Sequence, residues 1–326
     1  MVFVEFAVRL ALPAYDPSGH IRFIDGTATR PLMGPPNTSE RQIKNTGDFN
    51  VIVRFNKYGL RDDKNLKQSK KGDLFLVGDS FAFGWGVETR NRVSEIIEGL
   101  SGRPVFNLSS GGGDFDNYQM LLDYAARMGA ARGTAIVVIN METDLANYAN
   151  RRRPKAKTAT TPAKPRKTSF SADFLAFKSR LMENSALYFM ITSIVHTNAL
   201  LNAIAVKAGL IRPNLKAIRG DNVDSGAIRS SAKRMRDLLD KYPGFAVLVP
   251  SRANWTGNSR EKVRRVHMEF SRELKNQGVR VLDLLDSFNA TGEPLSYYFK
   301  NDAHWNPRGH RLAGRGIARF LGAADK

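Results

Sequence analysis

From Asp73 onward, short apolar runs of strand length alternate with amphipathic stretches of helical length. The apolar runs lie at 74–77, 105–109, 134–140, 244–249 and 279–283, and the helical stretches lie near 90–100, 117–128, 226–240, 259–277 and 308–321. Strands that alternate with helices form parallel sheets, because each right-handed crossover carries the chain back over one face of the sheet. The sequence therefore predicts an α/β fold with a parallel five-stranded sheet covered by helices on both faces.

Two segments do not follow this alternation. Residues 1–72 contain many Gly, Pro, Asn and charged residues between positions 16 and 71, which predicts an irregular lead-in with one strand near 50–55. Residues of about 150–225 form an insertion between the third and fourth strands, and their helical patterns lie near 171–183 and 186–207. We therefore expect a lead-in over 1–72 and a main domain over 73–326 that carries the insertion.

The insertion opens with a basic segment. Residues 151–168 contain eight Lys or Arg and no acidic residue, a composition that favours a flexible loop over a packed core. The stretch 186–206 has no charged residue and is long enough to span a membrane, but Thr, Ser, His and Asn interrupt it. We expect a buried or cap helix there first, a membrane-interface helix second and a membrane span third.

The amino-terminal run of residues 1–15 is apolar but contains Glu5 and Arg9. It is too short to span a bilayer and lacks the basic head and cleavage site of a signal peptide. Two interpretations remain open, the tail of a membrane anchor or a short amphipathic helix.

Composition narrows the class of protein. A chain of 326 residues with 42% apolar residues can bury a substantial core, and the absence of Cys excludes a disulfide framework and a thiolate metal site. The net charge of +19 favours polyanionic partners, either an anionic polymer or an anionic membrane surface that the basic loop 151–167 would contact. No helix or strand has a pattern suited to base recognition, so we expect no specific nucleic-acid partner.

Ser80 and His304 are candidates for nucleophilic catalysis. Ser80 follows the apolar run 74–77, and parallel sheets bind ligands at the carboxyl ends of their strands. A serine hydroxyl needs a base to remove its proton and a carboxylate to orient that base, and Asp302 and His304 lie just before the last predicted helix. An α/β-hydrolase would show Gly-x-Ser-x-Gly, whereas this chain has Ala82 at the fifth position.

The chain resembles the SGNH/GDSL hydrolases in four segments that occur in the order of that family's sequence blocks. The segments are Gly78-Asp79-Ser80-Phe81, Asn107-Leu108-Ser109-Ser110-Gly111-Gly112-Gly113, Asn140-Met141-Glu142-Thr143-Asp144-Leu145 and Asp302-Ala303-His304. The segment 56–61 is also similar to one in bacterial cell-envelope members, which often carry an amino-terminal membrane anchor. The resemblance implies a flavodoxin-like three-layer α/β/α fold.

The resemblance also implies roles for single residues. Ser80 would be the nucleophile, His304 the general base and then acid, and Asp302 its orienting partner. The backbone N–H groups of Ser80 and Gly112 would face the oxyanion, and the family's third donor is an Asn side chain at the position that Thr143 occupies here. Asn140 is an alternative donor.

Several further residues have more than one interpretation. Many family members have their Asp three residues before the His, where this chain has Asn301, so Asp302 fits a shorter Asp-x-His form. Trp85 and Trp305 are candidates for walls of an acyl pocket and equally for core positions. The histidines at 20, 196, 267 and 310 have no second ligand at metal spacing, and we expect them to be packed or solvated.

The predicted function is that of a serine esterase or O-acyltransferase that forms an acyl-Ser80 intermediate. The resemblance implies a short, acetyl-like acyl group on a small molecule or a bacterial glycan, no metal or organic cofactor, and a place at the cell envelope or in the periplasm. A carbohydrate-binding relative with little or no activity is one alternative, because of Thr143. A polyanion-binding or membrane-binding protein is another, because of the charge.

Overall fold

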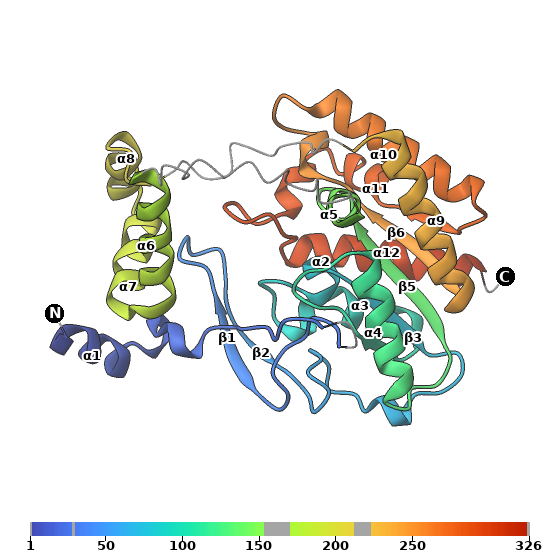
Figure 1. Cartoon of the computed structure of the whole chain (residues 1–326), viewed down its shortest axis with the longest axis horizontal. Coiled ribbons are helices and arrows are strands. Elements are labelled where there is room, and N and C mark those ends of the chain that lie inside the picture. Colours follow the sequence, from blue (N-terminus) through green and yellow to red (C-terminus); the bar gives the residue numbers. More distant parts are fainter. Residues whose placement is uncertain (1, 28–29, 153–169, 212–222, 325–326) are drawn as a thin grey trace, which may run out of the picture. The chain divides into compact units, whose positions relative to one another are not determined.

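A computed structural model describes residues 2–27, 30–152, 170–211 and 223–324 (Figure 1). The chain forms two compact units. The larger consists of residues 22–39, 53–152 and 215–326, and the smaller consists of residues 1–21, 40–52 and 153–214. Only the described residues within these ranges are discussed below. Most of the basic segment predicted to be flexible, residues 153–169, lies outside the described residues.

The larger unit contains a five-stranded parallel sheet in the order β4-β3-β5-β6-β7. Its strands are β3 (Leu74–Gly78), β4 (Val105–Asn107), β5 (Thr134–Asn140), β6 (Gly244–Val249) and β7 (Val281–Asp283). The first strand along the chain lies between the second and the third, which is the flavodoxin-like order 2-1-3-4-5. The predicted α/β/α fold is confirmed, and the predicted strands agree with the observed ones to within two residues.

Helices cover both faces of this sheet. One face carries α4 (Phe115–Arg127), α5 (Asp144–Arg152), α9 (Ser225–Lys241) and α10 (Arg260–Asn276), and the other carries α2 (Ser80–Phe83), α3 (Val93–Ser101), α11 (Leu285–Asn289) and α12 (Pro307–Ala324). Strands buried on both faces are apolar at consecutive positions, and β3 has no exposed residue. Side chains of alternate strand residues therefore enter two separate cores.

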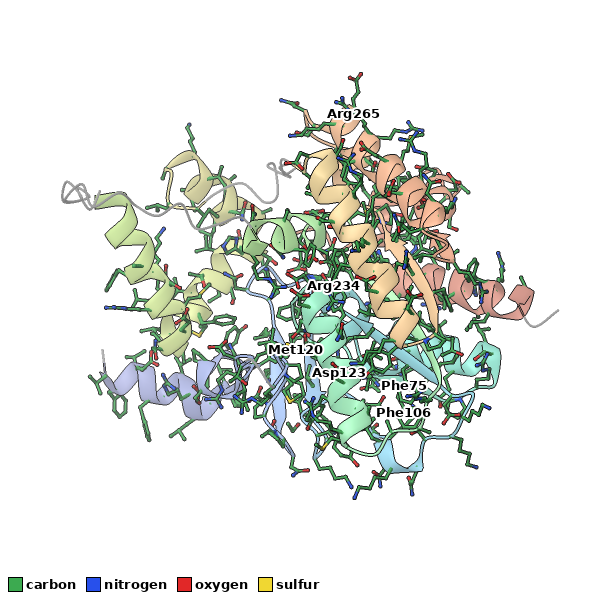
Figure 2. All side chains as sticks on the ribbon, turned by 45° about the vertical axis from the view of Figure 1, so that its right-hand side comes forward. Phe75, Phe106, Met120, Asp123, Arg234 and Arg265 are labelled. Atoms are coloured by element: carbon green, nitrogen blue, oxygen red, sulfur yellow. The ribbon has the colours of Figure 1, made fainter. Side chains whose placement is uncertain are left out.

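In the core beneath α4, α5, α9 and α10, side-chain contacts join neighbouring strands and neighbouring helices. Figure 2 shows Phe75 and Phe106 side by side on neighbouring strands, where their rings stack at 5.3 Å between centroids. At the rim, Arg234 of α9 donates to Asp116 of α4 at 2.8 Å. The helices α4 and α9 therefore pack on each other as well as on the sheet.

Residues 1–72 contain more regular structure than the sequence indicates. The strands β1 (Ser39–Ile43) and β2 (Asn50–Arg54) pair in a two-stranded sheet, so the predicted strand at 50–55 has a partner. The described residues also form short 3-10 helices, which are η1 (Pro13–Tyr15), η2 (Pro17–Gly19), η3 (Leu66–Gln68), η4 (Thr89–Asn91), η5 (Arg252–Asn254) and η6 (Pro294–Tyr297).

The smaller unit is helical. It contains α1 (Val2–Ala11), α6 (Phe170–Asn184), α7 (Ala186–Thr197) and α8 (Ala199–Lys207). The prediction of one helix over 186–207 is wrong, because Asn198 lies between α7 and α8 in an extended conformation. Its side chain accepts hydrogen bonds from the N–H groups of Leu200 and Leu201 and so begins a new helix. At this break, the axis of α8 turns by 100° from the axis of α7.

Candidate active site

Ser80 lies at the start of a tight strand-to-helix turn. Asp79 is the N-cap of α2, and its carboxylate accepts the N–H of Phe81 at 3.0 Å. A Cβ on Gly78 would lie 2.8 Å from the carbonyl oxygen of Val138 and 2.9 Å from Cβ of Ala82, so only glycine lets α2 begin directly after β3. The turn therefore holds the Ser80 hydroxyl at the carboxyl edge of the sheet.

Ser80, His304 and Asp302 come together in one hydrogen-bonded row. Ser80 Oγ lies 2.7 Å from His304 Nε2, and His304 Nδ1 contacts Asp302 Oδ1. The backbone N–H of His304 also donates to Asp302 Oδ1, at 3.1 Å. Asp302 is 5% exposed, so water competes little for its carboxylate. With Nδ1 protonated and bonded to Asp302, Nε2 is the ring nitrogen that can accept the serine proton.

The loop that carries His304 reaches Ser80 across the sheet. In the sheet, β5 and β6 separate β3, which precedes Ser80, from β7, the last strand before this loop. In the connection 284–306, Phe288, Tyr298 and Trp305 pack in the same core as side chains of β5 and β6, and α12 then packs against α3. A bridge between Tyr298 and Trp305 closes the loop, and Asn306 Nδ2 donates to the carbonyl oxygen of Tyr298 at 2.9 Å. Helix packing and these hydrogen bonds, and not strand adjacency, therefore position the histidine.

A second polar network lies behind the nucleophile. Asn140 Nδ2 donates to Asp79 Oδ2 at 2.9 Å and to Thr143 Oγ1 at 3.0 Å. Thr143 Oγ1 donates in turn to Asp144 Oδ1 at 3.2 Å, and Asp144 Oδ2 accepts from Tyr118 at 2.6 Å. Both hydrogens of the Asn140 amide are thus directed into the protein. The links from Asp79 to Asn140 and from Asp144 to Tyr118 were not apparent from the sequence.

The two carboxyl groups in this network share one buried environment. Burial raises the pKa of Asp79, and the hydrogen bond from Asn140 offsets part of that rise. Burial and then repulsion from Asp79 hold the pKa of Asp144 well above its usual range. Burial and the charge of Asp144 also raise the pKa of Tyr118. Asp144 is 0% exposed, and burial in a medium of low dielectric constant disfavours the charged form of a carboxyl.

Different steric and conformational constraints act on the three glycines at 111–113. A Cβ on Gly111 would meet the ring of Phe23 at 2.4 Å, and Gly113 has a φ of +123°. A Cβ on Gly112 would make only an ordinary contact, 3.7 Å from Leu32. Internal packing and backbone conformation thus account for Gly111 and Gly113. Packing within the chain does not account for Gly112, the glycine expected to face the oxyanion.

Aromatic rings surround His304. Trp85 stacks on the imidazole at 5.3 Å between centroids, and Phe23 stacks on Trp85 at 6.4 Å. Trp85 is partly exposed, whereas Trp305 is 0% exposed and packs edge-on against Phe81 in the core. Of the two tryptophans considered from the sequence, Trp85 is therefore the one that a substrate can touch. Phe23 comes from the lead-in, and its local sequence carries no signal for this position.

Arg61 supports the loop after the nucleophile from within the protein. Its guanidinium donates to the carbonyl oxygens of Gly84 and Val87 at 2.5 and 2.6 Å. Burial and then repulsion from Arg92 lower the pKa of Arg61 to about 9. Arg61 is the last residue of the segment 56–61. By holding the carbonyl group of Gly84, it fixes the position of the next residue, Trp85.

The remaining histidines lie apart from this row. His267 contacts Asp283 at 2.8 Å, and His20 packs edge-on against Phe189 at 4.8 Å between ring centroids. Burial and then repulsion from Arg61 lower the pKa of His310 to about 3. His196 lies on α7 and is partly exposed. Among the described residues, no three His, Asp or Glu side chains are arranged to hold a metal ion.

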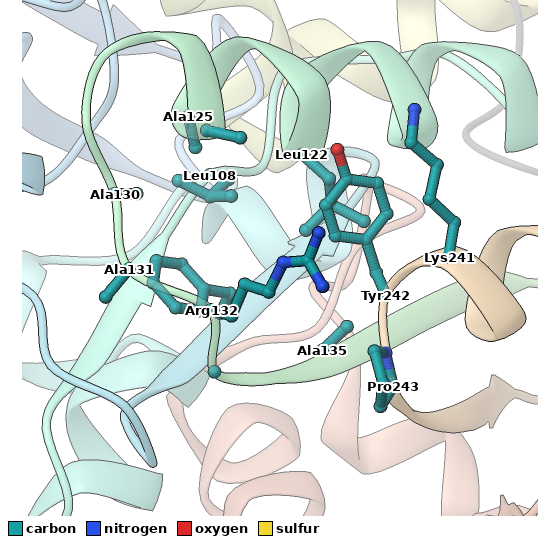
Figure 3. Close-up of a pocket in the computed structure, with 13 residues that line it drawn as sticks. Leu108, Leu122, Ala125, Ala130, Ala131, Arg132, Ala135, Lys241, Tyr242 and Pro243 are labelled. Atoms are coloured by element: carbon teal, nitrogen blue, oxygen red, sulfur yellow. The ribbon is translucent and has the colours of Figure 1, made fainter.

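A separate cavity of about 130 Å³ lies at the opposite edge of the sheet, between the ends of α4 and α9 (Figure 3). Leu108, Leu122 and Ala135 form its apolar wall, and the side chains of Arg132 and Tyr242 reach across its mouth. It contains none of the residues of the Ser80 site. The cavity is therefore distinct from the site at the carboxyl edge.

The sequence matches one family model over residues 246–326, described as the SGNH hydrolase-like domain of the acetyltransferase AlgX. No curated protein matches the chain. The match includes the loop of Asp302 and His304. It begins after the first three of the four segments that resemble the family's sequence blocks.

Solved structures of similar fold include three with low sequence identity. A lipolytic G-D-S-L family member from Veillonella parvula is 11% identical, with 77% of this chain and 98% of that chain covered and a TM-score of 0.42. A lipase/acylhydrolase from Enterococcus faecalis is 10% identical, with coverage of 78% and 96% and a TM-score of 0.42. An acetylxylan esterase from Geobacillus stearothermophilus is 11% identical, with coverage of 78% and 96% and a TM-score of 0.40.

Proposed function

We propose that the chain is a serine esterase or O-acyltransferase of the SGNH/GDSL type in which Ser80 carries the acyl group, and the family match over residues 246–326 supports this. The observation that supports this most directly is the 2.7 Å contact between Ser80 Oγ and His304 Nε2, with Asp302 bonded to the other ring nitrogen. A serine hydroxyl within hydrogen-bond reach of an oriented base is the arrangement that nucleophilic acyl transfer needs.

The reaction follows from this geometry. Ser80 Oγ attacks the carbonyl carbon of the ester while its proton passes to His304 Nε2, and the carbonyl oxygen becomes an oxyanion. The imidazolium is stabilised by Asp302 and gives its proton to the leaving alcohol as the carbon–oxygen bond breaks. Water or a sugar hydroxyl then attacks acyl-Ser80, with His304 again taking and returning the proton. Both outcomes regenerate the free serine.

The backbone N–H groups of Ser80 and Gly112 are the proposed oxyanion donors. Gly112 supports this role because packing within the chain does not require a glycine there, whereas close approach of a substrate would. The third donor is Thr143, whose hydroxyl now bonds to Asp144 at 3.2 Å. Asn140 is less suited, because Asp79 and Thr143 already accept from its amide.

We propose a short acyl group on a glycan as the substrate. The partial burial of Trp85 against His304 and Phe23 supports a narrow acyl site, and the family match names an acetyltransferase. Initial rates on p-nitrophenyl acetate and butyrate, beside a Ser80→Ala control, test this. A faster rate on acetate than on butyrate is expected, and equal rates for wild type and Ser80→Ala would contradict the proposal.

A carbohydrate-binding protein without activity is the second candidate, and Thr143 is the observation that favours it. Loss of one oxyanion donor typically costs about 10²–10³ in rate, which leaves a slow enzyme and not an inert one. An alkyl fluorophosphonate separates the two candidates. Covalent labelling that requires Ser80 supports the enzyme, whereas an unlabelled but folded protein supports the binding function.

A further inference from the structure

The smaller unit exposes most of the large apolar side chains on the surface of this protein. Within the described residues, only Leu100, Met268 and Leu295 are exposed large hydrophobics of the larger unit. In the smaller unit, Phe3 is 84% exposed and Leu200 is 69% exposed, and further examples lie along α1, α7 and α8. Soluble proteins rarely gather apolar surface in this way unless it is covered by a partner or a membrane.

Two helices of the smaller unit, α7 and α8, expose large aliphatic side chains and bury small residues, with Phe189 of α7 as a large residue that is also buried. On α7, Ser193 is buried while Ile191 and Ile194 are each 48% exposed. On α8, Ala205 is the buried residue while Ile204 is 56% exposed. Small and hydroxyl-bearing residues at helix contacts, with large aliphatic residues outside, are typical of helices surrounded by lipid.

The charged groups of α1 are satisfied within the unit. Glu5 accepts from Arg9 at 2.9 Å, from Ser185 at 2.8 Å and from the N–H groups of Ala186 and Leu187 at 2.8 and 3.0 Å. Burial alone would raise the pKa of Glu5, but these hydrogen bonds lower it to about 2. Glu5 thus points toward the first turn of α7, and Arg9 also donates to the carbonyl oxygen of Asn184 at 2.6 Å. The exposed side chains of α1, such as Phe3 and Phe6, are apolar. A helix end with paired charges can enter a medium of low dielectric constant.

Length decides between crossing and lying on a membrane. No single described helix is long and apolar enough to cross a bilayer. The helices α7 and α8 meet that criterion only together, and they are bent by 100°. From 186 to 206 the sequence has no charged residue. A bent, uncharged pair suits the boundary between headgroups and acyl chains, where apolar faces are buried by several ångströms.

We propose that α1, α7 and α8 form a membrane-docking surface that inserts apolar side chains into the interfacial region of a lipid bilayer. A protein partner is less well matched, because protein interfaces combine apolar centres with Arg and hydrogen-bonding groups, whereas the exposed positions of α7 and α8 are aliphatic except for Thr197 and Lys207 at the ends of the helices. The net charge of +19 complements anionic headgroups and adds a salt-dependent attraction. The proposal is independent of the esterase function.

Vesicle flotation with the full chain tests the docking surface. Vesicles of phosphatidylcholine alone, and of phosphatidylcholine with phosphatidylglycerol, separate apolar insertion from charge attraction. We expect binding to both, stronger with phosphatidylglycerol. The combined variant Phe3→Ser, Phe6→Ser, Leu200→Ser and Ile204→Ser should bind both kinds at least tenfold more weakly, because each substituted side chain is at least 56% exposed and none is needed for packing.

The matched control replaces exposed apolar residues elsewhere. Leu100→Ser, Met268→Ser and Leu295→Ser should leave vesicle binding unchanged. The proposal is overturned by an equal loss in this control, by binding that needs phosphatidylglycerol and disappears in high salt, or by the absence of vesicle binding. Self-association that the combined variant abolishes, without vesicle binding, would assign the surface to a second copy of the chain.

Site-specific labelling keeps the test valid if the combined variant does not fold. The chain has no Cys, so Ile204→Cys and Met268→Cys each accept one environment-sensitive fluorophore. Vesicles should shift the emission at position 204 to the blue and leave position 268 unchanged. Equal shifts at both positions, or none at 204, would refute insertion through α8.

Discussion

Asp144→Asn tests the buried carboxyl pair behind Ser80. Asp144 is 0% exposed, and the substitution keeps its shape while removing the ionisable group. The oxygen of the new amide can still accept from Tyr118 and from the backbone N–H of Asn140, which lie 2.6 and 2.9 Å from Asp144 Oδ2. The amide nitrogen can face Thr143 Oγ1, 3.2 Å away, which accepts its hydrogen. We therefore expect the variant to fold.

The sign of the effect follows from the raised pKa of Asp144, which burial and then Asp79 cause. Below its ordinary pKa of 3.8, the carboxyl is protonated in both the folded and the unfolded chain, and its contribution to stability is fully present. As the pH rises above 3.8, the unfolded chain loses this proton while the folded chain keeps it. The free energy of unfolding then falls by about 1.4 kcal/mol per pH unit until the folded carboxyl also ionises.

The variant lacks this loss, so its stability relative to wild type should increase by about 1.4 kcal/mol per pH unit above pH 4. Urea unfolding followed by tryptophan fluorescence measures it, since Trp85, Trp255 and Trp305 all belong to the larger unit. Asp237→Asn, at an exposed position on α9, is the control. A difference that is flat or falls with pH would refute the raised pKa.

Three further predictions concern single residues of the site and its surroundings. Asp302→Asn should lower kcat for p-nitrophenyl acetate by about 10⁴-fold, as loss of an orienting Asp does in a serine protease, while Asn301→Ala changes it little; the reverse result would make Asn301 the orienting residue. Thr143→Asn should raise the esterase rate, by up to about 10²-fold, because the Asn amide reaches further toward the oxyanion than the shorter Thr143 hydroxyl, and an unchanged rate would mean that no donor is missing at this position. His310→Leu should stabilise the larger unit, because neither ring nitrogen of this 0% exposed residue has a hydrogen-bond partner among the described residues. Burial and then Arg61 lower the pKa of His310 to about 3, so wild-type stability is lost as the pH falls from 6.5, and urea unfolding of the variant should lack that part of the loss.

The main sheet could be predicted because its strands are buried on both faces. The three central strands β3, β5 and β6 are long runs of mostly apolar, buried residues, and such runs stand out from the sequence around them. The strand β1 was missed because Ser39–Ile43 is mostly polar and pairs only with β2. The helix α2 was missed because it has four residues and depends on close packing of Gly78 against β5. Such an element carries no periodic signal of its own.

The candidate site divides in the same way. Ser80, Asp302 and His304 lie in short motifs at element ends, so the sequence alone indicates them. The Asp79–Asn140 hydrogen bond joins residues 61 positions apart, and nothing in either local sequence specifies the other. The position of Phe23 beside Trp85 has the same character, because it depends on how residues 22–39 pack within the larger unit. Long-range packing, which a single sequence does not encode visibly, decides these contacts.

The proton on Asp144 connects the stability of the fold to the proposed chemistry. When Asp144 is ionised, it accepts the hydroxyl hydrogen of Thr143, which is then directed away from a substrate. When Asp144 is protonated, the carboxyl can donate to Thr143 Oγ1, and the hydroxyl hydrogen is released toward the oxyanion. Burial raises the pKa of Asp144 and so widens the pH range in which Thr143 can act as a donor. An amide at position 144 imitates the protonated carboxyl, so Asp144→Asn should keep esterase activity to higher pH than wild type.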